Sequence, residues 1–312
     1  MNLLIIGNGF DLAHGLKTNY YDFLQWAYDN GHMGTNYGEH VLGNEKLQMP
    51  IPGFNLHSYW HNICNPDAEQ NEVPAFAKTL FRRHESWIDL ENNFAACLNS
   101  RDGWLIGKTK ILKALFDEFL VPKFEQYIAE VVNDDSVAAN TLSVSGADLV
   151  LCFNYSNTFE RLYDKRQRAK ICYVNGKAQG NATTSNIVFG CDCYEDSPHG
   201  KSEVGFDKVF QRAHKKTCDD YKDWISEDDN HHYRIYIVGH SLGRTDWDIL
   251  RPLIIAKTNT AKVYYHNEES HRDLIYNMMG MVGRESMNQR KIKFLPIAEL
   301  NIEHRDGFTV IG

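Results

Sequence analysis

A glycine-rich turn near the start of the chain has residues of the kind that bind phosphate groups. The apolar run of residues 3–6 leads into Gly7-Asn8-Gly9, and a helix-like segment follows. Two glycines allow a tight turn and a close approach of the backbone to an anion, and the first amides of the helix would point at that anion. Leu12 replaces the third glycine of the full dinucleotide fingerprint, so the pattern is equally typical of a generic turn between strand and helix. The side chains after the turn that could contact a ligand are Phe10, Asp11 and His14.

Asp11 supports two interpretations. It stands three residues before His14 on the first turn of the expected helix, where a sheet edge meets solvent, so the pair could contact a substrate. A carboxylate at the start of a helix also stabilises the helix through its negative charge and its capping capacity. The sequence leaves both interpretations open.

Three further predicted strands end in short polar residues, two of them beside glycine. Asn154 follows the apolar run that begins at residue 148, and its amide can donate and accept hydrogen bonds, as a ribose hydroxyl requires. An Asx turn that starts the next helix would use the same residue type. Because the carboxyl ends of parallel strands meet at one crevice, we expect these residues to lie near the first turn. They are Asn154 and Tyr155, Asn175 and Gly176, and Gly239, His240 and Ser241.

The last of these strand ends also fits a different chemistry. Residues 239–243 read Gly-His-Ser-Leu-Gly, the Gly-x-Ser-x-Gly pattern of the nucleophile elbow in α/β-hydrolases, which would make Ser241 a nucleophile. The bulky or charged residues 244–247 argue against an elbow, because the helix behind it must approach the sheet closely. Residues that could complete a serine hydrolase triad are nevertheless present, namely Asp246 or Asp248 and His266 or His271.

Short apolar or β-branched runs alternate with helix-like segments, which favours an α/β fold built on a buried, mostly parallel sheet. We therefore predict a Rossmann-like doubly wound sheet in a single domain of residues 1–312. The runs that predict strands are residues 3–9, 148–156, 170–176, 186–190, 234–241, 262–267 and 291–296.

The interval 20–146 between the first two predicted strands is expected to be a mainly helical insertion that forms one wall of a cleft. Residues 74–99 and 109–132 have apolar positions at helical spacing, and residues 31–73 are rich in glycine, asparagine, histidine and proline, as in a long loop.

Composition indicates a folded protein and disfavours some partners. The chain has 312 residues, of which 43% are apolar, 24% charged and 12% aromatic, with a formal net charge of −8. These fractions are those of globular proteins, and the negative charge argues against bulk binding to nucleic acid, although Arg82-Arg83-His84 could form a local basic patch. The first residues lack the features of a signal peptide, and no apolar run reaches the ~20 residues of a membrane span. We expect a cytoplasmic protein without a membrane partner.

The cysteines predict neither a disulfide framework nor a metal site. Seven cysteines, an odd number, are scattered along a long chain without an export signal, which favours reduced thiols. Cys191, Cys193 and His199 are close in sequence, but structural zinc usually takes four ligands and the common C-x2-C spacing is absent. We expect no metal.

Taken together, these segments resemble the AbiH family of bacterial proteins, which are associated with abortive infection against bacteriophage. The similarity lies in the order and approximate spacing of five segments that span most of the chain. They are residues 5–24, 86–94, 153–163, 174–178 with the following 187–190, and 237–250. The resemblance implies a role in antiphage defence.

AbiH proteins in turn resemble sirtuin-like domains, Rossmann-type folds that bind NAD and, in several defence systems, hydrolyse it. Residues 7–16 are similar to the glycine loop of those domains, and Asn154 falls where they keep the asparagine that handles the nicotinamide ribose. Gly239-His240-Ser241 is similar to the later glycine-serine turn along the dinucleotide. Asn175-Gly176 falls where sirtuins place a His-Gly pair, and an amide cannot take the proton that the histidine takes. A sirtuin-like deacylase is therefore disfavoured.

The resemblance implies that NAD or a related nucleotide is the ligand or the substrate. Hydrolysis of its N-glycosidic bond would need electrostatic stabilisation and a positioned water, for which Asp11, His14 or His240 could serve beside Asn154. We take Asn154, Asp11 and His240 as the candidate catalytic residues. The alternatives are a non-catalytic nucleotide sensor and a toxin held by a partner protein or in a homo-oligomer, with the esterase the least favoured. The sequence does not identify the phage trigger.

Overall fold

The core of the protein is a parallel sheet of six strands. In the computed structural model, residues 1–32, 119–133, 142–190, 204–225, 232–256, 260–289 and 292–302 are described. All neighbouring strands pair in parallel, in the order β3-β2-β1-β4-β5-β6. The predicted α/β fold with a parallel sheet is confirmed. The strands are β1 (Asn2–Ile6), β2 (Leu149–Cys152), β3 (Lys170–Tyr173), β4 (Arg234–Val238), β5 (Thr260–Tyr265) and β6 (Ile292–Pro296).

One predicted strand is wrong. Residues 186–190 form no strand, although they are apolar and largely buried. Val188 donates its amide to the carbonyl of Asn175 at 2.8 Å, outside the strand ladders, so the segment packs along the turn after β3 without joining the sheet. An apolar run indicates burial, and the burial here comes from packing against a loop and helix α10 (Lys208–Lys215), where Gln211 exchanges hydrogen bonds with Phe189.

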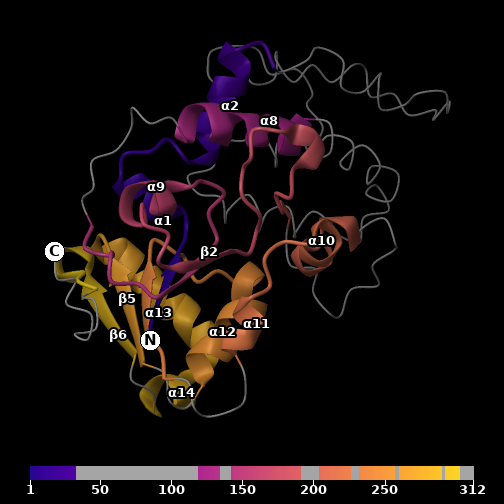
Figure 1. The fold of residues 1–312 in the computed structure, drawn as a ribbon. Helices are drawn as coiled ribbons and strands as arrows, with labels where there is room; N and C mark the ends of the chain where they lie inside the picture. Colours follow the sequence, from indigo (N-terminus) through magenta and orange to yellow (C-terminus); the bar gives the residue numbers. More distant parts are fainter. Residues whose placement is uncertain are drawn as a thin grey trace, which may run out of the picture.

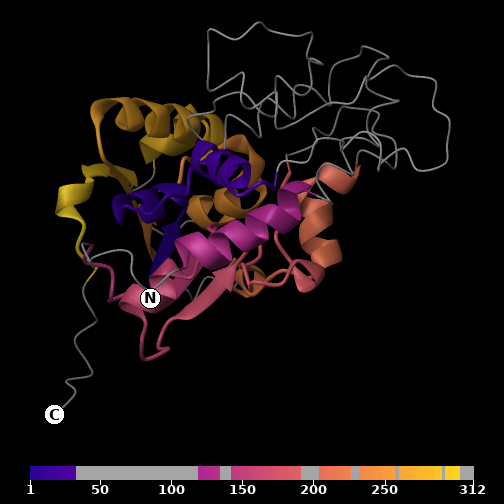
Figure 2. The same ribbon diagram turned by 90° about the horizontal axis from the view of Figure 1, so that it is seen from above.

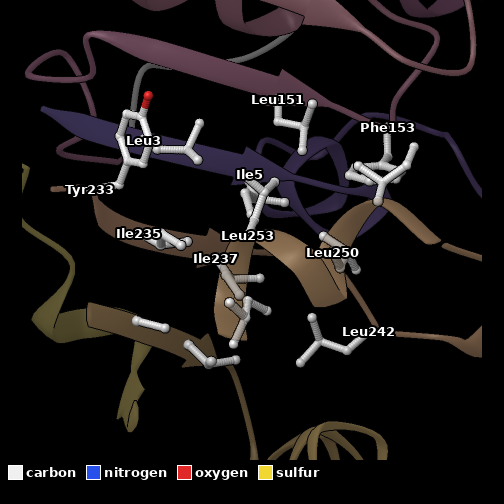
Figure 3. Packing of buried hydrophobic residues seen from close by; sticks show 14 of the residues in the cluster. Leu3, Ile5, Leu151, Phe153, Tyr233, Ile235, Ile237, Leu242, Leu250 and Leu253 are labelled. Carbon is white, nitrogen blue, oxygen red and sulfur yellow. The ribbon is translucent and has the colours of Figure 1, made fainter. Parts of the chain in front are cut away.

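The central strands are buried on both faces, which is why they appear in the sequence as continuous apolar runs. All five residues of β1 are buried. Leu3 and Ile5 belong to a core cluster on one face of the sheet, and Leu4 and Ile6 belong to a second cluster on the other face. Figure 3 shows the first cluster, in which Leu250 and Leu253 lie next to side chains of the sheet.

Helices cover both faces of the sheet (Figure 1). The face that carries Leu3 and Ile5 packs against α11 (Tyr221–Trp224), α12 (Trp247–Ile255) and α13 (Glu268–Val282). The face that carries Leu4 and Ile6 packs against α1 (Asn8–Ala13) and α9 (Thr158–Tyr163). The helix α14 (Arg284–Gln289) follows α13, and the short 3-10 turns are 182–184, 204–206, 244–246 and 297–299.

Two helices of the predicted insertion lie on the side to which the strands' carboxyl ends point. They are α2 (Tyr20–Asp29) and α8 (Val121–Tyr127), which lie together at the top of Figure 1. Their contact is aromatic: the ring of Phe23 lies 5.3 Å from that of Phe124. Seen from above in Figure 2, α8 continues into the π-helical residues 128–132 as one rod. The predicted helix 74–99 and loop 31–73 fall outside the described residues, apart from 31 and 32, so the insertion as a whole stays a prediction.

A disulfide joins β3 to the segment after α10, which corrects the expectation of reduced thiols. The bond links Cys172 to Cys218 across a sequence separation of 46 residues. Cys152 is a buried free thiol. Cys191, Cys193 and His199, the rejected metal ligands, lie outside the described residues.

The disulfide is expected to contribute measurably to stability. Closing a loop of this length restricts the unfolded chain and typically stabilises a protein by about 2–4 kcal/mol. We expect Cys218→Ser to lower the free energy of unfolding by about that amount in urea denaturation under non-reducing conditions. With reductant present, the wild type should converge on the variant. A variant as stable as the non-reduced wild type would show that the two sulfurs are not bonded in solution.

Candidate functional site

A cavity of about 830 Å³ opens at the carboxyl ends of the strands. The chain runs from β1 to β2 and β3 on one side, and continues on the other side of β1 with β4, β5 and β6. The crevice outside such a change of direction is the usual ligand position in open α/β sheets. Phe124 and Ile128 of the helical interval form part of its wall. The predicted site residues that line it are Gly7, Asn8, Gly9, Asp11, Asn154, Tyr155, Asn175, Gly239, His240 and Ser241.

The glycines of the two turns allow the turns to touch each other. The amide of Gly9 donates to the carbonyl of Gly239 at 2.8 Å. Gly239 has a φ of +67°, and a Cβ atom there would lie 2.0 Å from the amide nitrogen of Phe10. A Cβ on Gly7 would lie 2.8 Å from the Gly239 carbonyl oxygen. Close packing of the two turns therefore already requires these glycines, whether or not a phosphate approaches them.

Asp11 is a buried carboxylate in the cavity lining with one oxygen left unpaired. Its side chain is only 2% exposed, and its Oδ2 accepts a hydrogen bond from the Ser156 hydroxyl at 2.6 Å. Its Oδ1 is buried and makes no well-aligned hydrogen bond with any residue that the structure describes. Burial raises the pKa of Asp11 from 3.8 to about 6, and the hydrogen bonds from Ser156, Thr158 and Asn154 and the charge of Arg161 offset only part of that effect. A carboxyl group with such a pKa can exchange a proton near neutral pH.

The contacts of Asp11 bear on its two interpretations. Helix α1 begins after Gly7 without a side-chain cap, so Asp11 is not the capping residue. Its partner, Ser156, comes from the turn after β2, a contact that sequence reasoning missed. The available indication was the position of Ser156, two residues after Asn154 in the same short polar stretch.

Asn154 also keeps a buried polar atom unpaired. Asn154 is 5% exposed and lines the cavity, and its Nδ2 donor makes no well-aligned hydrogen bond with the described residues. Its side chain lies near enough to Asp11 to lower the pKa of that carboxyl group. Buried polar groups in native proteins are nearly always hydrogen-bonded, so an unpaired one needs an explanation. Here the acceptor on Asp11 and the donor on Asn154 lie near each other in the cavity lining, and neither makes a well-aligned hydrogen bond with the described residues. The pair could bind a ligand that has a hydroxyl group or a water molecule.

The side chains of Tyr155 and Asn175 form hydrogen bonds with other residues of the protein. The Tyr155 hydroxyl donates to the carbonyl of Val188 at 2.8 Å. The Asn175 amide donates to the carbonyl of Phe153 at 3.4 Å, and its Oδ1 accepts from Arg212 Nε at 3.3 Å. Asn175, at the position where a sirtuin has its histidine, is thus oriented from both ends of its amide.

Buried ion pairs connect α10 to the turn after β4. Asp246 Oδ1 contacts Arg212 at 3.0 Å and Lys208 Nζ at 3.3 Å, and Arg212 also contacts Asp248 at 2.8 Å. Burial by itself would raise the pKa of Asp246, but the charge of Lys208, the hydrogen bond from His240 and the charge of Arg212 together hold it well below its usual value. Asp246 is therefore ionised at all physiological pH values and holds these cations beside the cavity.

Both ring nitrogens of His240 are engaged. Its Nδ1 accepts the Leu242 amide at 2.9 Å, so in the neutral ring the proton is on Nε2, which faces Asp246 at 3.6 Å. The ring packs edge-on against Phe153, with centroids 4.3 Å apart. A histidine in this arrangement has no nitrogen available to take a proton from water. The geometry therefore favours Asp11 over His240 as the acid–base group.

Ser241 lines the cavity without the geometry of a nucleophile elbow. Its side chain is exposed, and the left-handed residues of the turn are Gly239 and Leu242. Helix α12 begins only at Trp247, after a 3-10 turn. Within the described parts of the chain, no histidine hydrogen-bonds to the Ser241 hydroxyl. The histidines proposed for a triad have other contacts: His266 with Asn267, and His271 with the ring of Tyr265.

Three of the predicted binding residues lie outside the cavity lining. Phe10 is fully buried in the core. His14 is buried beside it, with Nδ1 2.6 Å from the carbonyl oxygen of Phe10 and Nε2 2.5 Å from the Tyr163 hydroxyl, and burial lowers its pKa. Gly176 has a φ of +81°, and a Cβ there would lie 2.2 Å from the carbonyl oxygen of Asn186. Roles for these residues in ligand binding stay predictions.

Two further observations concern the residues that the structure describes. Among them, no group of three or more histidine, cysteine, aspartate or glutamate side chains could hold a metal ion. None of the described helices is long and apolar enough to cross a bilayer.

Comparison with known proteins establishes the family. A family model described as bacteriophage abortive infection AbiH matches residues 3–266. The chain belongs to the AbiH family. This AbiH match runs from the second residue of β1 to the end of β5 and covers every residue predicted for the nucleotide site, and it indicates a role in antiphage abortive infection. No curated protein and no solved structure matches the chain.

Proposed function

We propose that this AbiH protein binds NAD or a related nucleotide in the cavity and hydrolyses its N-glycosidic bond. The observation that carries the proposal is that two buried polar atoms in the lining of one cavity, Asp11 Oδ1 and Asn154 Nδ2, make no well-aligned hydrogen bond with the described residues. In a folded protein such atoms are costly unless a ligand or water satisfies them. They suit a sugar hydroxyl and an attacking water.

The architecture around these atoms supports a nucleotide. The strand order β3-β2-β1-β4-β5-β6 is that of doubly wound dinucleotide-binding sheets, in which the ligand lies where the order reverses. This agreement is what favours a Rossmann-like and sirtuin-like assignment. A volume of about 830 Å³ also falls within the range of small-molecule and cofactor sites.

The proposed reaction needs few groups from the protein. The bond between the ribose anomeric carbon and the nicotinamide nitrogen breaks, and nicotinamide leaves with the electron pair as a neutral molecule. Water adds to the resulting oxocarbenium-like carbon, which yields ADP-ribose and releases one proton. Asn154 would hold the ribose, and Asp11, mostly ionised at pH 7 given its pKa of about 6, would accept the proton of the water. Ser156 holds the other oxygen of Asp11 in place.

An NAD hydrolase would act in abortive infection by depleting the NAD of the infected cell. Growth would stop before the phage could complete its cycle, so the activity must be low until infection. Cytoplasmic location and restraint by a partner protein or by homo-oligomerisation belong to this proposal.

Replacing Asn154 tests the proposal most directly. We expect Asn154→Ala to lower kcat/KM for nicotinamide release from NAD by about 10- to 100-fold, because a hydrogen bond to the sugar is lost. The matched control is Asn288→Ala, an exposed asparagine on α14 away from the cavity, which should leave the rate unchanged. Ser241→Ala should retain activity under this mechanism.

Other outcomes would contradict hydrolysis. Equal rates for wild type and Asn154→Ala would remove Asn154 from the site. Unchanged cellular NAD during phage challenge, in cells that express the wild type, would overturn the NAD-depletion role. Ester hydrolysis that disappears with Ser241→Ala would favour the serine hydrolase instead.

A second candidate function is nucleotide sensing without hydrolysis. One observation favours the sensor. Asn175 stands where a sirtuin has its catalytic histidine, and His240 was predicted to act as a base, but the side chains of both form hydrogen bonds within the protein. Binding of NAD, measured by calorimetry, with no release of nicotinamide would support the sensor.

A further inference from the structure

Two serines in the described parts of the chain each donate a hydrogen bond to a buried carboxylate. Ser156 Oγ lies 2.6 Å from Asp11 Oδ2, and Ser185 Oγ lies 2.6 Å from Glu125 Oε2. Asp11 is 2% exposed and Glu125 is fully buried. A hydroxyl within hydrogen-bond distance of a base is the arrangement in which serine acts as a nucleophile. The surroundings of each pair decide whether it can do so.

The pair of Ser185 and Glu125 is a structural contact. Glu125 Oε1 accepts the amides of Gln179 and Gly180, the latter at 2.9 Å, so both oxygens of this carboxylate have partners. Neither Glu125 nor Ser185 lines the cavity. This pair therefore fastens the loop after β3 to α8, and a ligand in the cavity would not touch it.

The pair of Ser156 and Asp11 belongs to the cavity. Both residues line it, and Ser156 is 2% exposed. Asp11 Oδ1 makes no well-aligned hydrogen bond with the described residues, so this carboxylate is less fully occupied than that of Glu125. Burial raises the pKa of Asp11 to about 6, so its carboxylate accepts a proton more readily than that of an ordinary aspartate.

A second hydroxyl orients Ser156. Thr158, at the start of α9, is 1% exposed, and its Oγ1 lies 3.0 Å from Ser156 Oγ. When Asp11 is ionised, the single proton of Ser156 is directed at that carboxylate, so Thr158 is the donor in this contact. A hydroxyl oxygen has two lone pairs, and this arrangement leaves one of them for attack on a ligand in the cavity.

We propose that Ser156 accepts the ADP-ribosyl group of NAD, so that the protein modifies itself inside its own cavity. This inference rests on the proposed function, because it uses the same bond cleavage. Asp11 takes the proton of the Ser156 hydroxyl, and Ser156 Oγ forms a bond with the anomeric carbon of the ribose. The bond from that carbon to nicotinamide breaks, and nicotinamide leaves with the electron pair as a neutral molecule. The product is an O-glycosidic bond between Ser156 and ADP-ribose.

Ser156 and water compete for the same carbon. Two hydrogen bonds hold the serine in place, which favours its attack because the orientation is established before the reaction. Asn154, proposed to hold the ribose, comes two residues earlier in the same turn, which brings the reacting carbon near Ser156. The transferred group stays attached in the cavity and blocks the entry of another NAD molecule. The reaction therefore stops after a single transfer per chain and ends hydrolysis by that chain.

Mass spectrometry of the full chain after incubation with NAD tests the proposal. The wild type should gain a single ADP-ribosyl group, which peptide mapping places on Ser156. The bond should resist neutral hydroxylamine, because this reagent cleaves ADP-ribosyl esters of carboxylates but not a glycosidic bond to serine. The rate of nicotinamide release should fall in step with the modified fraction. Incubation with ADP-ribose in place of NAD should give no adduct, which excludes non-enzymatic attachment.

Ser185→Ala is the matched control for Ser156→Ala. Each variant removes a hydroxyl that hydrogen-bonds to a buried carboxylate at 2.6 Å, but only Ser156 lines the cavity. Ser156→Ala should lower the amount of adduct at least about tenfold, whereas Ser185→Ala should be modified to the same extent as the wild type. Thermal shift with NAD checks that each variant is folded and binds the dinucleotide. Peptide mapping of the wild type depends on neither variant.

The possible failures can be distinguished. Nicotinamide release without an adduct, or an adduct on Asp11 that hydroxylamine removes, would overturn Ser156 as the acceptor while cleavage of NAD in this cavity survives. An undiminished adduct in Ser156→Ala would lead to the same conclusion. If the wild type neither binds NAD in calorimetry nor releases nicotinamide from it, the proposed function and the self-modification both fail.

Discussion

Asp11→Asn is expected to remove hydrolysis and, at the same time, to make the fold more stable at pH 7. Losing the group that takes the proton of the water should lower kcat by about 10²- to 10⁴-fold. Stability should rise because burial in the native protein disfavours the charged carboxylate by more than its hydrogen bonds favour it. An asparagine of nearly the same shape carries no charge and can still accept the Ser156 hydrogen bond.

The direction of the pH effect follows from the raised pKa. Between 3.8, the usual value for an aspartate, and about 6, the value for Asp11, the folded state binds more protons than the unfolded state. Stability contributed by this group is therefore present below pH 4 and is lost as the pH rises through 6. The full shift corresponds to about 3 kcal/mol at pH 7, which is the upper limit of the gain in Asp11→Asn.

Urea denaturation between pH 4 and 8 measures this effect. The wild type should lose stability relative to Asp11→Asn as the pH rises from 4 to 6, and the difference should level off above pH 7. Asp219→Asn, which changes an exposed aspartate in a surface ion pair, controls for net charge and should follow the wild type. Parallel stability curves for wild type and Asp11→Asn would show that the pKa of Asp11 is normal. Undiminished hydrolysis would exclude Asp11 as the base.

Gly239→Ala is expected to be the most destabilising single substitution in the site. Its φ of +67° costs an alanine about 1–2 kcal/mol. In addition, the new Cβ would lie 2.0 Å from the Phe10 amide nitrogen and 2.3 Å from the Gly9 carbonyl carbon, both backbone atoms that cannot rotate away. The two turns would have to separate and break the hydrogen bond between Gly9 and Gly239. A loss of more than about 4 kcal/mol, or failure to fold, is expected.

Gly15→Ala separates the cost of the positive φ from the cost of the clash between the two turns. Gly15 has a φ of +74°, close to that of Gly239, but a Cβ there would have no atom of the described residues within 4 Å beyond its chain neighbours. Gly15→Ala should therefore lower the free energy of unfolding only by the cost of the positive φ, about 1–2 kcal/mol. Circular dichroism and thermal unfolding of both variants make the comparison. Equal losses would mean that contact between the two turns does not limit stability.

Much of the fold could be predicted from local sequence because a buried parallel strand is apolar on both faces. Six of the seven apolar runs taken as strands are strands. The seventh, residues 186–190, is equally apolar but is buried by a loop and α10. Apolarity reports burial, whereas strand pairing depends on neighbours that a local pattern does not contain.

The candidate site could likewise be predicted from the sequence only in part. Parallel strands place all their carboxyl ends at one edge, so the convergence of Gly7, Asp11, Asn154 and His240 on one cavity could be predicted from strand ends alone. Which atoms remain available could not be predicted. His240 was selected as a catalytic residue, but contacts with Leu242 and Asp246 engage both of its nitrogens.

By itself, the sequence determined the family, the parallel α/β sheet and the edge at which polar residues gather, because each depends on residue types and their order along the chain. Only the tertiary structure decided that Asp11 Oδ1 and Asn154 Nδ2 lack well-aligned partners among the described residues, that the glycines serve contact between two turns, and that residues of α13 line the cavity. These features depend on which distant segments bury a given atom and which of them offer it a hydrogen bond. Such contacts exist only once the chain has packed.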